Sequence, residues 1–145
     1  MRILDHPLHP PLTHFPISLL SISLLWDVIG IWKADPFWPR MALWCIIAGL
    51  AIAVPAVITG ISEYILIPDT HKGLGTATLH MMVMFGALSL YTASMVLRFD
   101  TAVFPAYGKL ISLVLSGLGL VLLLTGGWLG GELVFSHGIG IDKKI

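Results

Sequence analysis

The residues best suited to carry chemistry in this sequence are its six histidines. His6, His9 and His14 fall in a proline-rich stretch directly before the first long apolar run, as if lining the entrance to a membrane bundle. His80 lies inside an apolar run, where an ionisable side chain is costly unless it has a partner and therefore indicates function. Because imidazole is a ligand for haem iron and for copper, these histidines predict a cofactor or metal site.

The composition excludes an ordinary water-soluble domain. Of 145 residues, 57% are apolar and only 11% are charged. A formal net charge of zero gives no basic patch with which to bind nucleic acid, so the lipid bilayer is the expected partner. The runs near 12–32, 41–66, 74–97 and 107–135 are each long enough to cross the hydrocarbon core as a helix. We predict an all-α integral membrane protein, a four-helix bundle with antiparallel up-down topology.

An even number of spans places the N- and C-termini on the same face of the membrane. On this terminal face we expect all six histidines and two carboxyl groups: His6, His9, His14, His71, His80, His137, Glu63 and Glu132. Asp27, near the end of the first span, is expected to face the polar interface on the other side. Lys and Arg lie closest to the span ends on the face without histidines, which favours a periplasmic terminal face in a bacterial inner membrane.

Several residues around these histidines are further candidates. His80 and Met84 share one helical stripe, so Met84 lies a turn deeper than the imidazole. In the fourth span, Gly127 and Gly131 form a small-xxx-small pair, as do Gly126 and Gly130. Such a pair lets another helix, or the flat face of a macrocycle, approach the backbone closely. The structural alternatives are adaptable methionine packing, close helix packing, and imidazoles hydrogen-bonded to neighbouring carbonyls.

Three motifs resemble one known family. Gly130-Gly-Glu-Leu-Val-Phe-Ser-His-Gly-Ile-Gly-Ile141 is similar to the C-terminal motif of the domain of unknown function 2231 family, four-span bacterial membrane proteins. His9-Pro-x-x-x-His14-Phe-Pro16 resembles its opening motif, Gly60-Ile-Ser-Glu63-Tyr64 its Gly-x-x-Asp-Trp, and His80 the histidine of its third span. Glu63 and Met84 depart from the usual Asp and Asn. Some relatives are joined to Rieske or cytochrome-type domains, so the resemblance implies redox partners.

The leading hypothesis is therefore a membrane-embedded electron-transfer protein that binds haem b near the terminal face. It would pass electrons between a quinol pool and a membrane or periplasmic redox partner. Histidines from facing helices would ligate the iron, with His80 and His14 the first choices and His137 the next. Glu63 would act as a neighbouring proton-handling group, while Gly127 and Gly131 make room for the ring.

Two alternatives remain open. The first is a non-catalytic accessory subunit of a respiratory or photosynthetic complex, whose histidines form interhelical hydrogen bonds. The second is a copper or other transition-metal site made by His6, His9 and His14. A stand-alone enzyme is the least expected class, because short loops leave little room for a substrate pocket.

Overall fold

Four long helices make up most of the described part of the chain. The computed structural model describes residues 2–3, 6–99 and 108–140. The helices are α1 (His9–Lys33), α2 (Phe37–Tyr64), α3 (Leu74–Phe99) and α4 (Gly108–Phe135), and each is long and apolar enough to cross a membrane. Before α1, the short strands β1 (Arg2–Ile3) and β2 (His6–Pro7) pair antiparallel. The predicted all-α class with four spans is confirmed.

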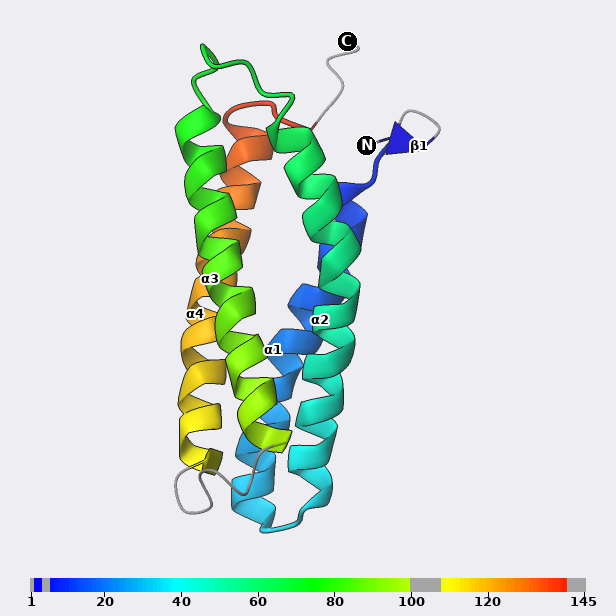
Figure 1. Ribbon diagram of the computed structural model, residues 1–145, viewed down its shortest axis with the longest axis vertical. Helices are drawn as coiled ribbons and strands as arrows, with labels where there is room; N and C mark the ends of the chain where they lie inside the picture. Colours follow the sequence, from blue (N-terminus) through cyan, green and yellow to red (C-terminus); the bar gives the residue numbers. More distant parts are fainter. Residues whose placement is uncertain (1, 4–5, 100–107, 141–145) are drawn as a thin grey trace.

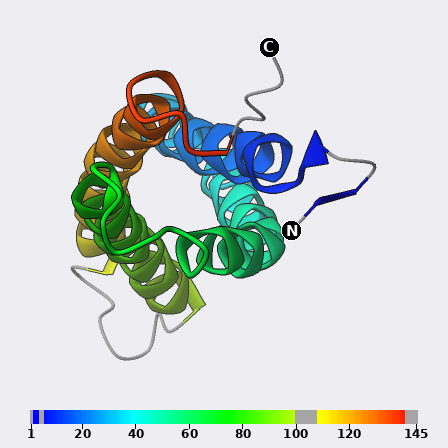
Figure 2. The same cartoon turned by 90° about the horizontal axis from the view of Figure 1, so that it is seen from above.

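The helices are arranged as two hairpins. In the first hairpin α1 packs closely on α2, and in the second α3 packs closely on α4, while the contacts between hairpins are fewer. Viewed from above, the helices form a ring in the order α1, α2, α3, α4 (Figure 2). Helices α1 and α3 therefore lie diagonally opposite each other. The start of α1 and the end of α4 lie at the same end of the bundle, which we call the histidine end (Figure 1).

Local sequence explains where the helices begin and end. Pro10 and Pro11 occupy the first turn of α1, where a missing N–H costs nothing, so the helix begins at His9 rather than at residue 12. After α4, Gly138 has a φ of 65° and the amide of Ile139 donates to the carbonyl of Leu133 at 2.9 Å. This left-handed turn explains a glycine after His137. Tyr107, the predicted first residue of span four, lies outside the described residues.

The large buried side chains are concentrated in the middle of the bundle. The core there consists of Leu20, Ile46, Ala87, Tyr91 and Leu123. Toward the histidine end the residues buried in the hairpins are mostly small, among them Ala53, Ala56, Thr59, Ala77 and Gly126. The ribbons of the two hairpins also diverge toward this end (Figure 1).

Candidate functional site: a histidine pair across the bundle

Two histidines on the diagonal helices have matching surroundings. In α1, Nδ1 of His9 lies 2.8 Å from the carbonyl oxygen of Ala56 in α2. In α3, Nδ1 of His80 lies 2.8 Å from the carbonyl oxygen of Gly126 in α4. Because a carbonyl can only accept, both Nδ1 atoms donate, and each neutral ring carries its lone pair on Nε2.

Glycines allow both rings to lie against the neighbouring helix. A Cβ at Gly60 of α2 would lie 2.8 Å from Cε1 of His9, and one at Gly130 of α4 would lie 3.3 Å from Cε1 of His80. Each glycine is one turn beyond the carbonyl that its histidine bonds, so hairpin one repeats the arrangement of hairpin two. The glycines at 60 and 130 are therefore part of the site. A Cβ at Gly60 would displace the ring of His9, and one at Gly130 would require the ring of His80 to move by a few tenths of an ångström.

His14, which the sequence favoured as the partner of His80, lies elsewhere. Its side chain is exposed, and its Nδ1 donates to the carbonyl of Pro10 in its own helix at 2.7 Å. The reason is helical geometry. The buried stripe of α1 runs through Pro16 and Leu20. His9 lies on the same stripe because it is seven residues, about two turns, before Pro16. His14 lies about 160° around the helix from Pro16 and so points away from this stripe. The structure therefore gives His14 an exposed position, and its choice as an iron ligand stays a prediction.

His137 lies at the histidine end but above the pair. Its ring packs on Gly73, and its Nε2 is 3.4 Å from the hydroxyl of Thr76 and 4.0 Å from Oε1 of Glu132. Thr76 is one turn before His80 on α3. A shallow surface pocket next to it is lined by Pro68, Thr70, His71, Lys72, Ser136 and His137. His137 is thus closer to the membrane surface than the histidine pair.

Of the remaining predicted site residues, Met84 contacts neighbouring residues, whereas Gly127 and Gly131 have no close neighbours. Met84 packs against Gly126 and against the core, so its sulfur lies beside the helix that holds His80 in place. Nothing lies within 4 Å of a Cβ built at Gly127 or Gly131, so the close approach inside this chain falls on Gly126 and Gly130 instead. Glu63 is half-buried near the end of α2. Its role in handling protons stays a prediction.

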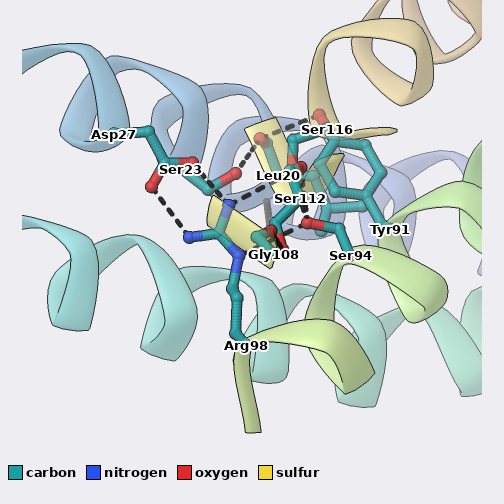
Figure 3. Close-up of polar contacts among 9 residues, drawn as sticks. All are labelled: Leu20, Ser23, Asp27, Tyr91, Ser94, Arg98, Gly108, Ser112 and Ser116. Carbon is teal, nitrogen blue, oxygen red and sulfur yellow. Dashed lines mark hydrogen bonds and ion pairs between the residues drawn. The ribbon is translucent and has the colours of Figure 1, made fainter. Parts of the chain in front are cut away.

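The sequence reading missed a buried ion pair between the diagonal helices. Asp27 of α1 is only 7% exposed and does not face the interface as expected. Its Oδ1 and Oδ2 accept from Nη1 and Nη2 of Arg98 in α3 at 2.8 and 2.6 Å (Figure 3). This bidentate geometry satisfies both charges away from water. The burial of Asp27 follows from the ion pair, which offsets the cost of removing its carboxylate from water.

Serine and tyrosine hydroxyls surround this ion pair. Arg98 also donates from Nε to the hydroxyl of Ser94 and from Nη2 to that of Ser116, at 3.3 and 3.4 Å. One turn further toward the core, the hydroxyl of Tyr91 donates to the carbonyl of Leu20 across the bundle at 3.0 Å. No buried polar side-chain atom among the described residues lacks a hydrogen-bond partner. The cluster is therefore saturated internally and joins α1 to α3.

The side chains available as ligands at the histidine end limit which kind of metal could bind there. Among residues 8–99 and 108–140, no group of three His, Cys, Asp or Glu side chains lies together as a metal site. The pair formed by His9 and His80 supplies two imidazoles from opposite sides of the bundle. Two ligands of this kind fit a metal that brings its own equatorial ligands, as the iron of a porphyrin does.

These features define an integral membrane protein of the four-span class, in which each hairpin carries one histidine bonded to the backbone of its second helix. Over residues 5–143 the chain matches the family described as predicted membrane protein (DUF2231), and it belongs to that family. The family resemblance drawn from the sequence motifs is thereby confirmed. Comparison with curated proteins and with solved structures gives no match.

Proposed function

We propose that this membrane protein binds haem b between its hairpins, through His9 and His80, and transfers electrons between a quinol pool and a redox partner. The observation that supports the proposal is the matched pair of hydrogen bonds from Nδ1 to a backbone carbonyl, each 2.8 Å long. Histidines that ligate metals typically donate their second ring nitrogen in this way, which fixes the ring and raises the basicity of the ligating nitrogen.

The surroundings of the two rings suit a flat cofactor. The residues buried near them are small, and the glycines at 60 and 130 let each imidazole lie against its neighbouring helix. When bound, haem would supply one-electron chemistry, while the protein sets its potential through the two imidazoles and the polarity around them. The role of the chain is to hold both rings in one tautomer and to keep the site within the apolar bundle.

Absorption spectroscopy of the protein purified from haem-replete cells tests this proposal. We expect a Soret band and, after dithionite reduction, the sharp α and β bands of low-spin haem with two histidine ligands. His9→Ala and His80→Ala should each lose haem or change its spin state. His14→Ala is the matched control on the same helix and should retain the spectrum, because its ring is exposed.

The outcomes separate the ligand choice from the proposal itself. Purified protein without Soret absorbance would reject haem binding. Haem that survives in His9→Ala but is lost in both His14→Ala and His80→Ala would return the choice to the ligands favoured by the sequence. Free imidazole added to His80→Gly should restore the low-spin spectrum, which a purely structural role of this ring would not produce.

A second candidate is an accessory subunit without a cofactor. The same observation supports it, because the bonds from His9 to Ala56 and from His80 to Gly126 already join neighbouring helices. This candidate predicts co-purification with large membrane partners and colourless protein. The copper alternative predicts metal without porphyrin, which elemental analysis of the purified protein measures. His6 cannot be placed in such a site here, since its side chain lies outside the described part of the chain.

A further inference from the structure

The two hairpins carry the same pattern of buried positions. The buried residues Pro16, Leu20 and Ser23 of α1 correspond, 71 positions later, to the buried residues Ala87, Tyr91 and Ser94 of α3. In the second helix of each hairpin the shift is 70. There, five buried residues correspond in order to five others: Ala42, Ile46, Gly49, Ala53 and Ala56 to Ser112, Ser116, Gly119, Leu123 and Gly126.

Contacts inside the hairpins repeat with the same shifts. Leu20 packs on Gly49, where a Cβ would lie 2.9 Å from its side chain, and Tyr91 packs on Gly119 at 3.0 Å. The bond from His9 to Ala56 corresponds to that from His80 to Gly126. The sequence keeps traces of the same relation, since Leu8-His9 aligns with Leu79-His80 and Ser18-Leu19 with Ser89-Leu90. The chain is thus a repeat of one helical hairpin around an approximate two-fold axis.

Asp27 and Arg98 occupy equivalent positions in this repeat. They are 71 residues apart, as are Leu20 and Tyr91. Equivalent residues on the diagonal helices meet across the axis, where identical charges would repel. Here the first hairpin carries the anion and the second carries the cation. An attractive pair therefore forms only when one hairpin of each kind is present. A second copy of either hairpin in the same place would bring two like charges together.

We propose that Asp27 and Arg98 are positioning residues that fix the separation of the hairpins, and with it the placement of His9 and His80. Among the described residues, the side chains with under 2% exposure lie within about one turn of the Leu20–Tyr91 level or nearer the ion pair. The histidine pair lies about 27 Å away along α1, from 18 residues at 1.5 Å each. At that end the buried residues are mostly small, with Leu133 the larger exception among the described residues. The hairpins meet there laterally through the hydroxyls of Tyr64 and Thr78 at 2.9 Å. The separation of the histidines therefore depends on how rigidly the other end is held.

Distances between spin labels test this in the full-length protein without any cofactor, so the result is independent of haem binding. In a Cys45→Ser background, labels at Ile65→Cys and Phe135→Cys report the histidine end. These positions are equivalent in the repeat and are both exposed, at 73% and 89%. We expect a narrow distance distribution in the parent and a broader or longer one in Asp27→Asn and in Arg98→Gln. Arg40→Gln, which removes an exposed cation, is the matched control and should change nothing.

The reciprocal exchange Asp27→Arg with Arg98→Asp is the decisive variant. Because the two positions are equivalent, the exchanged pair should restore the parent distance, whereas Asp27→Arg alone should not. Unchanged distances in both neutralising variants would overturn the proposal. If the single variants fail to accumulate, the exchange decides: accumulation with the parent distance supports the proposal, and failure to accumulate or a changed distance overturns it.

Discussion

Replacing Asp27 by asparagine should destabilise the bundle strongly, because it leaves an arginine buried without its counter-ion. The side chains of Arg98 and Asp27 are only 12% and 8% exposed, and arginine does not lose its proton to escape the cost. Removing one partner of such a pair costs about 3–5 kcal/mol. Arg98 would keep its bonds to Ser94 and Ser116, which favours the lower end of the range. A loss of about 3 kcal/mol lowers the folded-to-unfolded ratio roughly a hundredfold.

Reversible unfolding in mixed micelles, followed by circular dichroism or steric trapping, measures this loss. Asp35→Asn is the control, since Asp35 is exposed in the connection after α1 and its carboxylate accepts the amide of Phe37 at the helix start rather than pairing across the bundle. The double variant Asp27→Asn with Arg98→Gln removes both charges and should cost clearly less than the sum of the single variants. A loss below about 0.5 kcal/mol for Asp27→Asn, the usual range of surface changes, would refute the reasoning.

Two smaller changes probe the contacts beside these sites. Tyr91→Phe removes the buried bond to the carbonyl of Leu20 and should cost about 1 kcal/mol in the same unfolding assay; no measurable loss would show that this bond does not hold α1 to α3. Gly130→Val should displace the ring of His80 and lower the haem content of purified protein relative to Gly127→Val, whose added atoms meet open space. Equal haem content in the two glycine variants would contradict the arrangement described for Gly130.

Much of the fold could be predicted because it depends on local properties of the chain. The apolar runs predict the four helices, and the largest differences in the boundaries are at the starts of α1 and α2, which begin at residues 9 and 37 rather than 12 and 41. Both first turns contain proline, which is tolerated there. The connection between α1 and α2 covers residues 34–36, shorter than the expected 33–40, with Ala34 in a left-handed conformation at its start. These features depend only on residues that lie within one or two helical turns of each other in the sequence.

The site depended on relations between helices that no single span shows. Choosing His14 over His9 ignored the stripe that continues from Leu20 through Pro16, on which His9 lies and His14 does not. The pairing of Asp27 with Arg98 crosses the diagonal of the bundle, so neither span reveals it alone. A signal was present nonetheless: aligning Leu8-His9 with Leu79-His80 places Asp27 opposite Arg98.

The position of the ion pair in the chain also has a consequence for the order of synthesis. The first hairpin contains Asp27, and the residue that neutralises it follows 71 residues later, in α3. At a synthesis rate of about 5–20 residues per second, Arg98 is added roughly 4–14 s after Asp27. During that interval the carboxyl group of Asp27 has no counter-ion from α3. Asp27 lies near the end of α1, close to the polar interface of the membrane. Because Arg98 lies in α3, the ion pair can form only after this helix has been synthesised, and the first hairpin alone cannot neutralise Asp27 in this way.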